Sequence, residues 1–376
     1  MRAIEFLNEA AKPKVGREFQ HVEDLVYIDG PAGAKHAIER LRDLASGQHK
    51  AEIKWDGSPV VIFGRDESGS FHFGDKFAKN NITSPEELYA LYLGRNKDPS
   101  EERLAFAKGM SELYGLYEQA TPKDFRGYVE ASLLYKDTPP LNKNNEYEFM
   151  PNTVKYFVDK NSDIGKRMGS SKTGCAMTAY MEDRTGARLP PGDRWKTIGS
   201  KDVLVLPPKY SESTAGIDTG NLDKIIKSID ANAGAIEQFI ADEPGFSDIK
   251  AILYNYVNQQ TAQRKLTTLG SNFLEWVNSN DKISNNKKQK IQNRIASNQK
   301  GIQAIFNLVK NIMVVKDDVI DQLESNTLKS IGIRAEIYTG EPGGEGLVSD
   351  PGNDLNPLKL VKRGVFTAAN AEKGGR

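Results

Sequence analysis

A β-hairpin is the first element that the pattern of apolar and polar residues predicts clearly. Residues 51–63 are rich in Ile, Val, Trp and Phe, a polar turn follows at residues 65–70, and residues 71–73 resume the extended pattern. Two runs of β-forming residues joined by a short polar turn are typical of paired antiparallel strands. We therefore expect a β-hairpin that starts right after Gly57.

Helical and extended patterns follow one another along the first 210 residues or so. Apolar residues at helical spacing predict a helix at residues 33–44. A second helical segment is expected at residues 84–120, because it opens on a serine followed by proline and two acids. Further strands are expected at residues 126–136, 152–158, 174–181 and 202–206.

The pattern then changes for more than a hundred residues. Helical spacing of apolar residues continues from about residue 219 to about residue 330, and strand patterns return at residues 333–338 and 358–361. We predict an α+β protein with mixed antiparallel sheets, interrupted by an all-helical insert. The predicted parts are 1–215 and 331–376 for the sheet domain and 216–330 for the insert.

Overall charge gives no sign of a nucleic-acid partner. The 376 residues include 51 basic and 51 acidic side chains, so any basic surface must be local. The insert carries one run of cations: Lys282, Lys287, Lys288, Lys290, Arg294 and Lys300. This run fits either a helix that binds phosphates or an ordinary solvated helix face.

Composition also bears on the cellular compartment of the protein and on which metals it could bind. Cys175 is the one cysteine, which excludes an intramolecular disulfide and fits a reducing cytoplasm. One cysteine and four scattered histidines do not favour a structural zinc site. We expect a cytoplasmic protein without a membrane partner, because no apolar run is long enough to cross a bilayer.

Three short motifs carry the chemistry. Residues 52–58 read EIKWDGS, residues 344–348 read GEGLV, and residues 358–363 read LKLVKR. They resemble, in this order, the K-x-D-G, E-G-x-V and lysine-rich strand motifs of the covalent nucleotidyltransferases. This superfamily comprises ATP-dependent DNA and RNA ligases and mRNA capping enzymes. The resemblance covers about residues 45–210 and 330–365, and it implies a ligase-type adenylation domain.

The resemblance also implies how a site would work. Lys54 would be the nucleophile that takes AMP from ATP, Glu345 would hold Mg²⁺, and Lys359 would neutralise the α-phosphate. An amine must lose its proton before it attacks, and nearby cations favour that loss. Further nucleotide-binding residues implied by the family are Glu52 and Phe157 for the base, Glu130 for the ribose, and Asp56, Gly57, Arg65, Lys76 and Lys362.

The motifs depart from the family in ways that bear on the acceptor. Pro59 stands where the first motif usually has arginine, and Ser58 follows the glycine as in a subset of RNA ligases. Val361 stands where the last motif usually has its second lysine. The sequence ends 13 residues after Arg363, which leaves no room for the C-terminal barrel of capping enzymes and most DNA ligases.

These features favour a ligase that joins 5′-phosphate and 3′-hydroxyl ends, with RNA favoured over DNA. Two alternatives stay open. The first is a ligase-fold protein without catalysis that binds nucleic acid or has a structural role. The second is a nucleotidyltransferase whose acceptor is not a polynucleotide.

Overall fold

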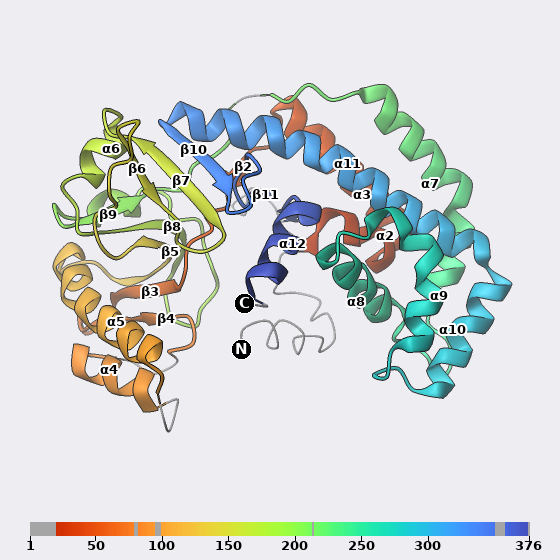
Figure 1. Ribbon diagram of the computed structural model, residues 1–376, viewed down its shortest axis with the longest axis horizontal. Helices are drawn as coiled ribbons and strands as arrows, with labels where there is room; N and C mark the ends of the chain where they lie inside the picture. The colour runs from red at the N-terminus through yellow and green to blue at the C-terminus, as the bar shows by residue number, and fades with distance from the viewer. Residues whose placement is uncertain (1–19, 79–81, 95–98, 213, 350–357, 375–376) are drawn as a thin grey trace.

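The protein has the outline of an arch, with strands gathered on one side and most helices on the other (Figure 1). The computed structural model describes residues 20–78, 82–94, 99–212, 214–349 and 358–374. Helix α11 (Gln299–Ser330) runs from the helical side to the sheet side. We call residues 60–206 with strand β10 the sheet lobe, and residues 22–46 with 219–330 the helical lobe.

A five-stranded sheet forms the centre of the sheet lobe. Its order is β4-β3-β5-β8-β9, and its neighbours are antiparallel except for the parallel pair β8 and β9. The bounds are β3 (Val60–Arg65), β4 (Phe71–Asp75), β5 (Gly127–Tyr135), β8 (Thr173–Met181) and β9 (Val203–Leu206). Helices α4 (Pro85–Gly94) and α5 (Glu101–Ala120) pack on one face, where Val61, Phe63 and Val129 are fully buried.

A smaller antiparallel sheet packs beside the first, in the order β10-β7-β6. Its strands are β6 (Glu146–Phe149), β7 (Val154–Asp159) and β10 (Ile333–Ile337), and helix α6 (Asp163–Met168) follows β7. The Phe149 ring lies 5.7 Å from the Tyr135 ring of the large sheet and 5.5 Å from the Tyr156 ring. Aromatic contacts therefore join the two sheets.

A third sheet brings distant parts of the chain together. Its order is β1-β12-β11-β2, with bounds β1 (Gln20–His21), β2 (Ala51–Ile53), β11 (Leu347–Ser349) and β12 (Leu358–Leu360). Strand β11 is antiparallel to both β2 and β12, whereas β1 is parallel to β12. All three sequence motifs therefore meet in this sheet or at its ends.

The helical lobe contains more than the insert. Its helices from the insert are α7 (Thr219–Ile240), α8 (Ile249–Ala262), η3 (Leu266–Thr268), α9 (Leu269–Ser279), α10 (Asn285–Ser297) and α11. The N-terminal elements η1 (Val22–Asp24), α2 (Leu25–Ile28) and α3 (Gly30–Ser46) pack against α7, α8 and α11. Helix α12 (Arg363–Gly374) packs on α8, and η2 (Arg194–Thr197) belongs to the sheet lobe.

Helix α11 shows why the insert folds as it does. Asn298 caps its first turn by accepting a hydrogen bond from the Gly301 amide at 2.9 Å. Apolar residues at helical spacing, among them Ile305, Val309 and Ile312, are fully buried. This apolar face packs against α3, α7 and β10, so the helix is stabilised mainly by tertiary contacts.

Most elements expected from the sequence are confirmed. The hairpin, the strands near residues 126–136 and 174–181, the helical insert and the mixed α+β class all occur as predicted. The single helix expected over residues 84–120 is two helices, α4 and α5, and strand β6 and helix α12 were not predicted. Among the described residues, no helix is both long and apolar enough to span a bilayer.

Candidate functional site

Lys54 and Glu345 meet although 291 positions separate them in the sequence. Lys54 follows β2 directly, and Glu345 lies two residues before β11, which pairs with β2 through Leu347 and Ile53. The Lys54 amide donates a hydrogen bond to the Gly346 carbonyl at 3.0 Å, which continues the pairing past the strand ends. The Lys54 ammonium then forms a salt bridge with the Glu345 carboxylate.

The sheet register places Lys359 on the same face as Glu52. Val348 of β11 lies opposite Glu52 on one side and Lys359 on the other, and Lys359 lies opposite His21. Directly opposed side chains point to the same face of a sheet. Lys54 is two residues after Glu52, so alternation directs it to that face as well.

Burial and neighbouring charges act on Glu345 together. Removal from water raises the pKa of Glu345, the cations Lys54 and Lys359 partly oppose this effect, and Asp56 adds to it. The side chains of Lys54 and Glu345 stay partly open, with 26% and 13% of their surface exposed. The pair is therefore half-buried yet within reach of a ligand.

Asp56 and Gly57 fix the loop that carries Lys54. The Asp56 carboxylate accepts hydrogen bonds from the Val154 amide at 2.6 Å and from the Asn152 side chain at 2.8 Å. A Cβ atom on Gly57 would lie 2.5 Å from the Cβ atom of Ser132, so only glycine fits there. Both residues thus position the Lys54 loop, and their expected part in nucleotide binding stays a prediction.

Glu130 lies in the middle of β5, opposite Ile62 of β3. Its neighbours Val129 and Ala131 are buried under the α5 face, so alternation places Glu130 on the opposite face of the sheet. Arg188 donates to its carboxylate at 2.7 Å and Thr178 at 3.2 Å. Glu130 therefore stands on the face of the sheet away from α5, already paired with one cation and 18% exposed.

Phe157 does not lie where a base-stacking residue was expected. The guanidinium carbon of Arg334 is 3.7 Å from the centre of the Phe157 ring, and the ring is 7% exposed. Tyr156, its neighbour in β7, points to the opposite face, where its hydroxyl accepts a hydrogen bond from the Asp56 amide at 2.9 Å. The tyrosine, not the phenylalanine, therefore faces the Lys54 loop.

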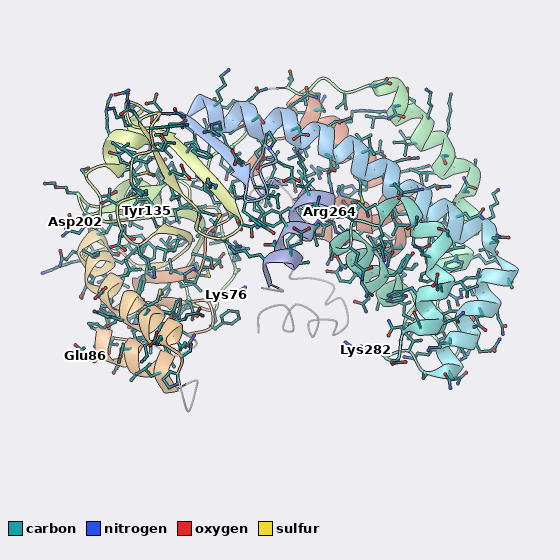
Figure 2. The ribbon with its side chains drawn as sticks, viewed as in Figure 1. Lys76, Glu86, Tyr135, Asp202, Arg264 and Lys282 are labelled. Carbon is teal, nitrogen blue, oxygen red and sulfur yellow. The ribbon has the colours of Figure 1, made fainter. Side chains whose placement is uncertain are left out.

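Three predicted cations are used elsewhere or stand apart. Arg65 donates to the carbonyls of Pro122, Gly69, Glu118 and Thr121 at 3.0–3.3 Å, so its guanidinium is occupied by the chain itself. Lys362 follows β12 and pairs with Asp321 of α11 at 2.6 Å. Lys76 is exposed with its ammonium 5.0 Å from the Phe77 ring, and Figure 2 shows it on the side of the sheet lobe that borders the opening of the arch.

The cationic run of the insert also has internal partners. Lys288 and Lys290 donate to the carbonyls of Asn278 and Gly245 at 2.7 and 3.0 Å, and Arg294 donates to that of Phe239 at 2.7 Å. Lys287 pairs with Asp248, and Lys300 donates to the Ala231 carbonyl at 3.2 Å. Much of this run therefore ties helices of the lobe together.

A buried ionic network supports the site from behind. The Glu23 carboxylate binds Lys316 of α11 at 3.0 Å and Arg363 of α12 at 3.1 Å, and Arg363 also binds Asp24 at 2.7 Å. All four side chains are fully buried. His21 lies beside this network, and burial together with the cations Arg363, Lys316, Lys359 and Lys54 lowers its pKa well below the usual value.

Sequence patterns missed a second acid at the site, Glu324 of α11. Its carboxylate accepts hydrogen bonds from the amides of Gly344 and Gly346 at 2.9 and 2.8 Å, on both sides of Glu345. Burial raises the pKa of Glu324 to about 7, although these amides and Lys362 oppose the shift. The signal in the sequence was a lone acid within the apolar stripe of a long helix.

Within the part of the chain that the structure describes, no group of three or more His, Cys, Asp or Glu residues could hold a metal ion. A metal at Glu345 would therefore depend on phosphate oxygens for further ligands. This donor set fits Mg²⁺, which proteins commonly bind through one or two carboxylates together with substrate phosphates and water.

Comparisons with known proteins give a family and no function. No curated protein and no solved structure matches the chain. The model of one protein family, described as a family of unknown function (DUF6267), matches residues 17–373. This match covers nearly the whole chain, including every residue of the site, and the chain therefore belongs to the DUF6267 family.

Proposed function

We propose that this protein is an ATP-dependent polynucleotide ligase of the covalent nucleotidyltransferase type, acting on RNA in preference to DNA. One observation carries the proposal. The ammonium of Lys54 contacts the carboxylate of Glu345, and the strand register brings Lys359 to the sheet face that Lys54 follows, although the three residues come from distant parts of the chain. Neighbouring strands β2, β11 and β12 bring them together.

The first step of the proposed reaction is attack by the Lys54 amine on the α-phosphorus of ATP. An N–P bond forms, the bond to pyrophosphate breaks, and the amine gives up a proton. Glu345 contacts this amine directly, so it is placed to hold or accept that proton. Bound Mg²⁺ would offset the charge of the leaving pyrophosphate.

The next two steps pass AMP to the nucleic acid and then release it. A 5′-phosphate oxygen of the acceptor attacks the phosphorus of the Lys54 adduct, the N–P bond breaks, and the leaving nitrogen takes up a proton to restore the Lys54 amine. A 3′-hydroxyl then attacks the activated 5′-phosphorus and gives up its proton, a phosphodiester forms, and AMP leaves. Lys359 contributes a positive charge next to Glu345 that would stabilise the charge on the α-phosphate in each transfer.

Two further residues support nucleotide binding. Glu52 lies on the same face of its sheet as Lys359, where a base could be recognised by its carboxylate. Glu130 stands on the face of the five-stranded sheet away from α5 and is held by Arg188 and Thr178, which would fix it for a ribose hydroxyl. Phe157 has no part in the proposed site, because Arg334 covers its ring.

The test is covalent labelling with ATP that carries its label on the α-phosphate, in the presence of Mg²⁺. We expect a labelled protein band, and we expect Lys54→Ala to reduce labelling about a thousandfold or more because the nucleophile is gone. Lys172→Ala is the matched control, since the Lys172 side chain is 64% exposed and pairs with Asp202 at 3.0 Å on the surface.

The remaining outcomes separate the alternatives. Sealing of 5′-phosphorylated RNA to a 3′-hydroxyl end supports the ligase, and a comparison with DNA ends measures the preference between them. Labelling without transfer to either strand points to an acceptor that is not a polynucleotide. Absence of labelling with both ATP and GTP contradicts the proposal and leaves a binding or structural protein.

A further inference from the structure

Glu324 is a buried acid that the proposed chemistry does not use. It lies near the end of α11 and is 1% exposed. Its two oxygens accept hydrogen bonds from the amides of Gly344 and Gly346, one oxygen to each amide, at 2.9 and 2.8 Å. One carboxylate of the helical lobe therefore holds both neighbours of Glu345.

The glycines around Glu345 fit this contact. A Cβ atom on Gly344 would lie 2.5 Å from an oxygen of Glu324, so any side chain there would displace the carboxylate. Gly346 has φ +123°, and a Cβ atom on it would lie 2.1 Å from the Leu360 carbonyl. Because Gly344 and Gly346 have no side chains, the Glu324 carboxylate of α11 can reach their backbone amides.

Lys54 holds the same segment from the other side. Its amide donates to the Gly346 carbonyl at 3.0 Å, and its ammonium contacts Glu345. The amide and the carbonyl of Gly346 are thus bound by Glu324 and Lys54 respectively. A continuous set of contacts runs from α11 through Glu345 to the proposed nucleophile.

Helix α11 makes two further contacts with the segments that build the site. Asp321, one turn before Glu324, pairs with Lys362 at 2.6 Å just after β12. Lys316 binds Glu23 at 3.0 Å just after β1. The helix therefore contacts the flanks of β1, β11 and β12 along one side, and it forms a wall of the site.

We infer that Glu324 is a positioning residue that keeps Glu345 against Lys54, which makes the helical lobe part of the nucleotide-transfer site. The effect on nucleotide transfer rests on the proposed function, whereas the positioning itself does not. Because α11 extends into the helical lobe (Figure 1), a ligand of that lobe that moves α11 would also move Glu345.

The first test measures the chemical reactivity of Lys54 and needs no nucleotide. The Glu345 carboxylate contacts the Lys54 ammonium and shields it from reagents in solution, so freeing Lys54 from Glu345 should make it react faster with an acetylating reagent. The test variant is Glu324→Gln, which keeps the size of the side chain but loses one hydrogen-bond acceptor. Glu345→Gln is the reference for a Lys54 freed from its partner. A third variant, Asp318→Asn, is the control. Asp318 is an exposed acid of the same helix and is the matched control.

Acetylation is followed at each lysine by mass spectrometry. We expect Glu324→Gln to raise the rate at Lys54 about threefold or more, towards the rate in Glu345→Gln, with Asp318→Asn like the wild type. Lys316, which is fully buried, reports unfolding in the same sample. An unchanged rate at Lys54, or a rise that Lys316 shares, overturns the inference.

The second test uses nucleotide labelling of the full chain at varied Mg²⁺. If Glu345 holds the metal, Glu324→Gln should raise the Mg²⁺ concentration for half-maximal labelling about tenfold and leave labelling at saturating Mg²⁺ largely intact. A variant that melts earlier but keeps the wild-type Mg²⁺ dependence contradicts the inference. Absence of labelling in the wild type contradicts the proposed function instead, and the acetylation result still decides the role of Glu324.

Discussion

At the scale of single residues, the site consists of charged groups that have been removed from water. Burial raises the pKa of Glu345 and raises the pKa of Glu324 to about 7, whereas it lowers the pKa of His21. Each shift disfavours the charged form of its group. The cations Lys54 and Lys359 oppose this effect at Glu345. The phosphates and metal of a bound nucleotide would also change the pKa of Glu345.

Glu324 should make the stability of the protein depend on pH in a defined window. Its pKa is raised from 4.5 to about 7 in the folded chain, so the folded state binds the proton more tightly than the unfolded state. The contribution of this proton to the free energy of unfolding is fully present below pH 4.5 and is lost as the pH rises to about 7. The loss amounts to about 3 kcal/mol.

The measurement is the free energy of unfolding of the wild type and of Glu324→Gln in urea, across this pH range. Their difference isolates Glu324 from the other titrating groups nearby, including Asp321 and Lys362. We expect the wild type to lose stability relative to the variant between about pH 4.5 and 7, and no further change above that. A difference that is constant with pH would exclude the raised pKa.

At the scale of helices and strands, the sequence predicted elements well and side-chain faces less well. The hairpin and β5 followed from β-forming runs, and the K-x-D-G motif located Lys54 at the end of β2. Phe157 was expected at the base, but Tyr156 and Phe157 are adjacent aromatics, and alternation alone does not say which of the two faces the Lys54 loop. Glu324 was missed because no motif surrounds it.

The two faces of β7 give a direct prediction. Phe157→Leu should leave the apparent KM for ATP within about twofold of the wild-type value, since the ring lies under Arg334 and away from Lys54. It should cost about 1 kcal/mol of stability through the lost contact between ring and guanidinium. ATP titration of the labelling reaction and urea denaturation measure the two effects, and a KM increase of about tenfold or more would return Phe157 to the nucleotide site.

At the scale of the whole molecule, segments from both ends of the chain meet behind the site. Glu23 and Asp24 follow β1, Lys316 belongs to α11, and Arg363 begins α12. The sequence placed the first 215 residues in the sheet domain, but α2 and α3 pack with the helical lobe. Hydrophobic spacing predicts a helix but does not say which lobe the helix packs against. The packing of α2 and α3 with the helical lobe therefore could not be predicted from their own sequence.

Because the buried ionic network joins segments from distant parts of the chain, we expect its loss to lower the stability of the whole fold. Arg363→Leu would leave Glu23 with only Lys316 and leave Asp24 without its cation, in full burial. Breaking a buried pair from one side costs about 3–5 kcal/mol, because an uncompensated charge stays in a medium of low polarity. Arg42→Leu is the matched control, since Arg42 forms an exposed pair with Asp223 at 3.0 Å, and its loss should cost at most about 1 kcal/mol.

The free energy of unfolding in urea, measured at low and high salt, distinguishes the two arginines. Salt screens an exposed pair far more than a buried one, so the cost of Arg363→Leu should persist at high salt while that of Arg42→Leu fades. Arg363 also lies four residues after Lys359, so its loss should slow labelling of Lys54 as well as weaken the fold. Equal costs for both variants would mean that the network does not join the two ends of the chain, and the site would then depend on the strand pairing of β2, β11 and β12 alone.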